Sequence, residues 1–169
     1  MNNMAKLCLA VGLCAASASA SAVEAHVIVW ADVDPTLSLL KADGTALDDS
    51  VELVHRAGTG LTAWNEQVRI YSNDLGKDVE VRLARSLELV PTNAGPTAKA
   101  VPMTVTLNSR ELKTTVTDFT AAELFTGAIN GGSIAMPLVV GQTTLAPIAV
   151  AGKYEGLLSI VLSQKTTSL

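Results

Sequence analysis

Residues 22–44 read AVEAHVIVWADVDPTLSLLKADG. In this stretch Val27, Val29, Ala31 and Val33 alternate with bulkier or polar residues, so they share one face of an extended chain. Such alternation is typical of a β-strand with one buried side. The first residues of a domain usually fray unless tertiary contacts hold them. The stretch therefore raises the question of which strand it pairs with, and in which molecule.

The segment before this strand, residues 1–22, has the features of a secretory signal peptide. Lys6 supplies the positive charge, and the apolar run over residues 7–16 is too short to span a bilayer as a helix. Small residues precede the expected cleavage site between Ala22 and Val23. An N-terminal helix of the folded domain is the less favoured interpretation.

Removal of this segment changes the composition of the chain. Both cysteines, Cys8 and Cys14, lie in the segment, so the remaining 147 of 169 residues contain no thiol. Lys6 is one of 12 basic residues, so 11 basic and 16 acidic residues remain, a net charge of −5. We expect a single domain held by packing and hydrogen bonds without disulfides. The acidic balance without a basic stripe disfavours nucleic acid as a partner.

Short segments with a period of two fill the rest of the chain. Turn residues rich in Gly, Asn, Asp and Pro separate them. Many short strands at this spacing favour an antiparallel β-sandwich. The strand candidates are residues 36–40, 50–56, 66–72, 78–84, 86–90, 101–108, 112–119, 136–140 and 154–163.

Two segments are expected to differ from this pattern. Residues 91–100, PTNAGPTAKA, are expected to form a long surface loop. The run TAAELF at 120–125 predicts a short helix in which Thr120 is the N-cap and Glu123 completes a capping box.

Clusters of catalytic or metal-binding residues are not apparent in the sequence. The two histidines, His26 and His55, lie in separate strand candidates. Asp32 and Asp34 form a D-x-D pair, but the other oxygen ligands and the central glycine of a calcium-binding loop are missing. There is no Gly-rich phosphate loop and no G-x-S-x-G motif. We expect no enzymatic activity, no metal and no cofactor.

The C-terminal stretch AGKYEGLLSIVLS, residues 151–163, has apolar residues on both faces. Leu157 and Val161 lie on the second face. The segment is either an ordinary central strand or a strand that borders a gap in the sandwich. The first face carries Gly152, Tyr154, Gly156, Leu158, Ile160 and Leu162.

Both ends of the mature chain resemble the major pilins of class 5 fimbriae, the colonisation-factor antigens of the alternate chaperone–usher pathway. The shared features are the Val-Glu start at Val23, the V-D-P step at 33–35, the L-L-x-A-D-G run at 39–44 and the A-G-x-Y-x-G run at 151–156. Trp30 departs from the family pattern, in which a small polar residue is expected.

The resemblance implies an all-β fold, an incomplete immunoglobulin-like β-sandwich over residues 37–169. Donor-strand complementation, a known case of β-strand addition, would complete it. Residues 23–36 would be the donor strand, and Pro35 would mark its exit from the neighbouring subunit. The residues that would enter the neighbour's groove are Val27, Val29, Ala31 and Val33. The acceptor groove would be lined by Gly152, Tyr154, Gly156, Leu158, Ile160 and Leu162.

The resemblance also implies the partners and the cellular location. The partners would be identical subunits in a head-to-tail filament, a periplasmic chaperone, an outer-membrane usher and a tip adhesin subunit. The chain would pass through the periplasm to a fimbria on the cell surface. The alternatives are a minor or tip subunit and a free-standing secreted β-sandwich that binds carbohydrate or a surface partner through Trp30 and Trp64. A secreted hydrolase is the least favoured.

Overall fold

The structure is a computed structural model that describes residues 37–127, 129 and 131–165. All of these residues belong to one unit of the chain, residues 33–169. The predicted signal peptide, with its cleavage site at Ala22 and Val23, lies outside the described residues. So do the predicted donor-strand residues Val27, Val29, Ala31, Val33 and Pro35.

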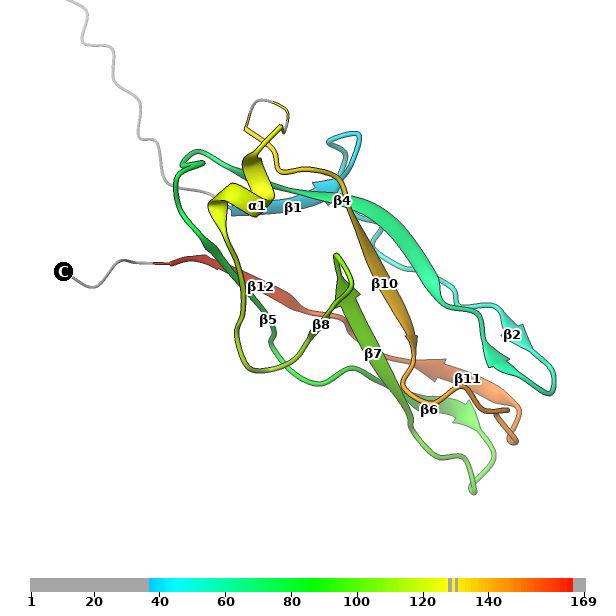
Figure 1. Ribbon diagram of the computed structural model, residues 1–169. Coiled ribbons are helices and arrows are strands. Elements are labelled where there is room, and N and C mark those ends of the chain that lie inside the picture. Colours follow the sequence, from blue (N-terminus) through cyan, green and yellow to red (C-terminus); the bar gives the residue numbers. More distant parts are fainter. Residues whose placement is uncertain (1–36, 128, 130, 166–169) are drawn as a thin grey trace, which may run out of the picture. The chain divides into compact units, whose positions relative to one another are not determined.

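The described residues form twelve β-strands and one short helix, α1 (Ala121–Phe125). The fold is therefore all-β, as predicted (Figure 1). The strands are β1 (Leu37–Lys41), β2 (His55–Arg56), β3 (Gly60–Leu61), β4 (Trp64–Ser72), β5 (Val79–Leu83), β6 (Glu88–Ala94), β7 (Val101–Leu107), β8 (Arg110–Leu112), β9 (Thr117–Phe119), β10 (Met136–Gln142), β11 (Gly152–Glu155) and β12 (Ile160–Gln164).

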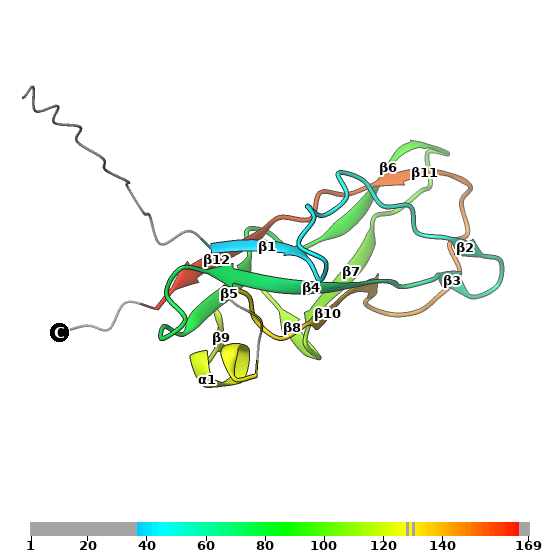
Figure 2. The same cartoon turned by 90° about the horizontal axis from the view of Figure 1, so that it is seen from above.

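The strands form two main antiparallel sheets and a short hairpin (Figures 1 and 2). The larger sheet has the order β1-β4-β10-β7-β6-β11, and β8 pairs with β7. The smaller sheet has the order β12-β5-β9, and β2 pairs with β3 in the hairpin. The chain passes from one main sheet to the other between β4 and β5, β5 and β6, β8 and β9, β9 and β10, and β11 and β12.

Alternate residues of the central strands form the core, as their period of two predicts. Buried residues alternate with partly exposed ones along β4, β5, β7 and β10. Full burial of each large aliphatic side chain contributes about 1.5–3 kcal/mol. The fully buried core residues include Val68, Ile70, Val79, Val81, Val105, Leu107, Phe119, Leu124, Met136 and Leu138.

Helix α1 has the predicted capping box. The backbone N of Glu123 donates to Thr120 Oγ1 at 3.3 Å, and the backbone N of Thr120 donates to Glu123 Oε2 at 3.4 Å. Leu124 anchors the helix in the core, and its carbonyl accepts from Ile134 N at 2.8 Å. Among the described residues, no helix has the length and apolar character needed to cross a membrane.

Three expectations about individual segments are wrong in part. Residues 112–119, expected as one strand, divide between the end of β8 at Leu112 and β9. Of residues 50–56, only His55 and Arg56 form a strand, and Val51 and Val54 are exposed. Residues 91–94 belong to β6 instead of a loop, because β11 provides the partner that holds them extended.

Candidate functional site

Two strands from different sheets, β1 and β12, lie side by side without hydrogen bonding to each other (Figures 1 and 2). Within the described part of the chain, β1 pairs only with β4, and β12 pairs only with β5. Each therefore has one open edge. An open strand edge presents a row of backbone donors and acceptors to which another strand can pair. We call the region between β1 and residues 158–164 the seam.

The two strands of the seam run in opposite directions. Leu37, at the start of β1, lies opposite Ser72 in the register of β1 and β4. Gln164, at the end of β12, donates from Nε2 to Ser72 Oγ at 2.9 Å. The start of β1 and the end of β12 are thus at the same end of the domain, which we call the terminal end. A strand placed in the seam would be parallel to one wall and antiparallel to the other.

The walls of the seam are apolar but incompletely buried. All five residues of β1 are half-buried, in contrast to the fully buried positions of β4 and β5. Leu157, just outside the seam, is 65% exposed. The seam therefore retains apolar surface that a further strand could cover. The half-buried apolar residues that line it and pack against the core are Leu37, Leu39, Leu158, Ile160 and Leu162.

The first half of the predicted groove wall is in a different place. Gly152 and Tyr154 belong to β11, which pairs with β6. A Cβ atom on Gly152 would lie 2.3 Å from Ala94 Cβ, and one on Gly156 would lie 2.4 Å from the carbonyl oxygen of Glu88. Both glycines therefore allow a close approach to β6.

The prediction of one continuous strand from Gly152 to Leu162 is consequently wrong. The chain leaves β6 after Glu155 and joins β5 in the other sheet at Ile160. The Tyr154 hydroxyl donates to the Val150 carbonyl at 2.8 Å, in the connection before β11. The structure brings together Leu158, Ile160 and Leu162 at the seam, and their role as acceptor residues stays a prediction.

Sequence reasoning does not identify the opposite wall of the seam. The alternation over residues 36–40 predicts a strand, but its leucines give no indication that the strand lies at an edge. Leu47 and Leu53, in the connection from β1 to β2, are also half-buried against the core.

A tight turn fixes the end of β1. Gly44, with φ of 87°, donates from its backbone N to the Lys41 carbonyl at 2.8 Å. The Asp43 carboxylate accepts from the Thr45 hydroxyl at 2.6 Å and from the Thr45 backbone N at 2.9 Å, and these bonds lower the pKa of Asp43. Lys41 Nζ donates to Asp48 Oδ1 at 2.7 Å, which raises the pKa of Lys41. The L-L-x-A-D-G run thus ends one wall of the seam.

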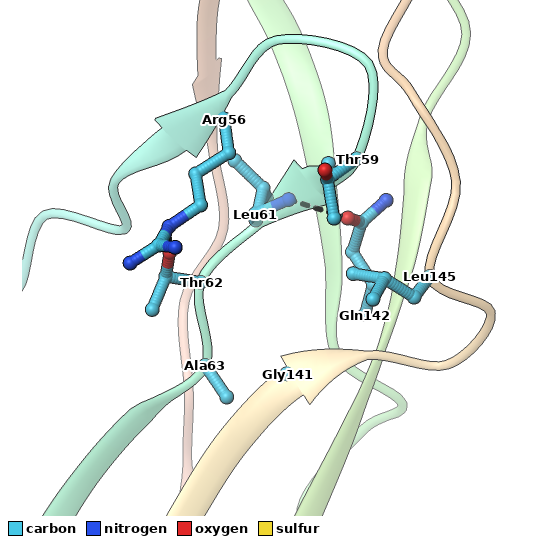
Figure 3. Close-up of a pocket in the computed structure, with 9 residues that line it drawn as sticks. Arg56, Thr59, Leu61, Thr62, Ala63, Gly141, Gln142 and Leu145 are labelled. Atoms are coloured by element: carbon cyan, nitrogen blue, oxygen red, sulfur yellow. Dashed lines mark hydrogen bonds between the residues drawn. The ribbon is translucent and has the colours of Figure 1, made fainter.

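The other end of the domain contains a cavity of about 490 Å³ (Figure 3). It lies between the β2–β3 hairpin and the end of β10. The backbone N of Leu61 donates to Gln142 Oε1 at 2.6 Å across it, and Arg56 Nε donates to Thr62 Oγ1 at 3.0 Å. Neither the cavity nor any other place in the described part of the chain gathers three His, Cys, Asp or Glu residues that could hold a metal.

The chain matches known proteins over most of its length. Residues 23–163 match the family described as CS1 type fimbrial major subunit. The chain is 35% identical over 150 residues to a CFA/I fimbrial subunit of Escherichia coli O78:H11, covering 86% of this chain and 87% of the relative. It is 32% identical over 157 residues to a CS1 fimbrial subunit of Escherichia coli, covering 89% and 91%.

A solved structure has a similar fold. The CooA pilin subunit from enterotoxigenic Escherichia coli superposes with a TM-score of 0.63 and 26% identity, over 80% of this chain and 91% of that one. The match confirms the predicted immunoglobulin-like pilin fold. The relatives are structural fimbrial subunits, so the prediction that the chain is not an enzyme is also confirmed.

Proposed function

Because the chain belongs to the family of CS1 type fimbrial major subunits, we propose that it builds the shaft of a fimbria by donor-strand exchange. Residues 23–36 of one copy would occupy the seam of the next. The observation that carries this proposal is the pair of half-buried edge strands, β1 and β12, which lie side by side in separate sheets without a shared ladder. A strand between them would pair with both edges and cover both walls.

The division of the chain follows from this role. Residues 1–22 are removed as a signal peptide, residues 23–36 form the donor extension, and residues 37–169 form the pilin domain. The family match supports this division, because it begins at residue 23.

Burial of the donor side chains provides the affinity. Val27, Val29, Ala31 and Val33 would contact the half-buried residues of the seam, and Pro35 would mark the exit. Three valines and an alanine contribute roughly 5–9 kcal/mol before ordering costs, at about 1.5–3 kcal/mol for each large aliphatic side chain. Since the donor and acceptor surfaces of one copy are different, the contact is head-to-tail, and it produces an open filament as long as the rotation between successive copies does not close a ring.

The open seam also explains the need for partners before assembly. An unpaired edge beside exposed apolar surface promotes aggregation. A periplasmic chaperone would cover the seam after secretion. At the outer-membrane usher, the N-terminal extension of the next subunit would replace the chaperone. A tip adhesin subunit would stand at the distal end of the filament. A minor or tip subunit and a free-standing binding module are less well supported, because the matched family is that of major subunits.

The test compares two proteins produced in the periplasm without a chaperone. One is residues 23–169, and the other carries a linked copy of residues 23–36 after Leu169. Because β12 ends at the terminal end, the appended copy can turn back and lie antiparallel to β12. We expect the first protein to aggregate or unfold at low temperature and the second to be a stable monomer.

A matched control carries Val29→Asp in the appended copy alone. The charged side chain should prevent burial and remove the stabilisation. Equal stability of residues 23–169 with and without the appended copy would show that the sandwich is already complete, and would contradict the proposal.

A further inference from the structure

The end of the domain opposite the terminal end has the character of a protein-binding surface. It consists of the β2–β3 hairpin and the connections after β6 and β10, and we call it the hairpin end (Figures 1 and 2). The cavity of Figure 3 opens here, lined in part by Arg56, Ala63 and Leu145. Leu145 is 61% exposed and Val54, just before the hairpin, is 62% exposed.

This cavity has an uncompensated positive charge. Arg56 uses Nε to bond Thr62, and in the described part of the chain its Nη1 and Nη2 atoms have no hydrogen-bond or ion-pair partner. A neighbouring cavity shares Gln142 and contains Lys99. Neither cavity has an Asp or Glu among its lining residues. An acidic, partly apolar segment would therefore complement the hairpin end in both charge and shape.

The chain itself contains such a segment immediately before β1. Residues 32–36 read Asp-Val-Asp-Pro-Thr, which combines two carboxylates with a valine and a proline. Donor-strand exchange, on which this inference rests, would place that segment where the donor strand leaves the seam of the next copy.

The geometry of growth determines the end at which the donor leaves. Each domain begins at Leu37, at the terminal end. If the donor strand left the acceptor's seam at the terminal end, the domain that follows the donor strand would lie at that end. It would then block the acceptor's own N-terminal extension, which also begins at the terminal end. If the donor strand instead runs antiparallel to β12 and leaves at the hairpin end, the acceptor's extension remains free to enter another subunit. Only the second arrangement gives continued head-to-tail growth.

We propose that the cavity at the hairpin end binds residues 32–36 of the next copy of this chain as they leave the seam. Arg56 forms an ion pair with the carboxylate of Asp34, and Ala63 and Leu145 contact Pro35. The pair fixes the orientation of successive subunits and slows the release of the donor strand.

The experiment uses filaments assembled from the full chain with its chaperone and usher. Their dissociation into monomers in detergent is followed at low and high salt. Arg56→Glu and Asp34→Arg should each increase the dissociation rate at low salt by about tenfold or more, because each places two like charges against each other at the interface. The double variant Arg56→Glu/Asp34→Arg should recover most of the wild-type rate.

Two further variants make the result decisive. Lys113→Glu makes the same change of charge on an exposed side chain between β8 and β9, and should dissociate at the wild-type rate. Leu145→Asp places a negative charge at the cavity from an exposed position, so it should weaken the filament without affecting folding. If the Arg56→Glu protein fails to accumulate, the dissociation rate of Leu145→Asp filaments is the test of the cavity.

Wild-type dissociation rates for Arg56→Glu and Leu145→Asp, or no recovery in the charge swap, would overturn the inference. Failure of the proposed function is distinguished by Val29→Asp in the extension. Normal filaments from Val29→Asp would contradict donor-strand exchange itself. If Val29→Asp forms no filaments while the cavity variants behave like wild type, only the role of the cavity is wrong.

Discussion

At the scale of single residues, two glycines explain why the C-terminal stretch is not one strand. Gly152 and Gly156 face the backbone of β6 so closely that a side chain would overlap Ala94 or the Glu88 carbonyl. The chain can therefore pair with β6 and then depart toward β5 within a few residues. In the sequence the same two glycines share a face with Tyr154, which suggests a continuous groove wall.

We expect Gly156→Ala to destabilise the domain by about 1–3 kcal/mol, because its Cβ would lie 2.4 Å from a backbone oxygen that cannot move aside cheaply. The matched control is Gly76→Ala. Neither glycine has a positive φ, and a Cβ on Gly76 would meet only the Asp74 carboxylate at 3.4 Å. Urea unfolding of the domain with the appended donor strand measures both, and similar losses for the two variants would argue against the close approach.

At the scale of elements, local signals predict well where the element is held by its own residues. The capping box of α1 needs only Thr120 and Glu123, and it is visible in the sequence. Central strands such as β5 and β10 are predictable because alternating burial is visible in their own residues.

Elements that depend on a distant partner are predicted poorly. Residues 91–94 contain turn-forming residues, yet they are extended because β11 pairs with them. Residues 50–54 alternate as a strand would, but within the described structure no strand pairs with them. The seam likewise could not be predicted in full, since it is defined by which sheet edges β1 and β12 leave open.

For helix α1, Thr120→Ala should lower the free energy of unfolding by about 1 kcal/mol, because it removes the hydroxyl that accepts from the backbone N of Glu123. Thr126→Ala makes the same substitution at the C-cap of the helix, where no N-terminal N–H depends on the hydroxyl, and should have little effect. Thermal unfolding of the two variants provides the comparison. An equal loss of unfolding free energy in Thr120→Ala and Thr126→Ala would show that the N-cap hydrogen bond makes no specific contribution to stability.

At the scale of the whole molecule, the proposed function requires that the domain be stabilised by contacts with the donor strand of another subunit. Its walls at the seam are half-buried leucines and isoleucine, whereas equivalent positions in the central strands are fully buried. A filament in which every seam is filled would therefore be more stable than any free subunit. The strength of the fibre would come from the same side chains that make the isolated domain vulnerable.

Two adjacent leucines provide the sharpest test of this idea. Leu158 packs against the core at the seam, while Leu157 is 65% exposed. The measured quantity is the gain in unfolding free energy that the appended residues 23–36 confer on each variant, so that direct effects on the domain cancel. Leu158→Ser should reduce this gain by about 1–2 kcal/mol, because the donor valines lose an apolar neighbour. Leu157→Ser should leave the gain unchanged. If the two serine variants lose the same amount, the donor strand does not lie against β12, and another edge of the domain must accept it.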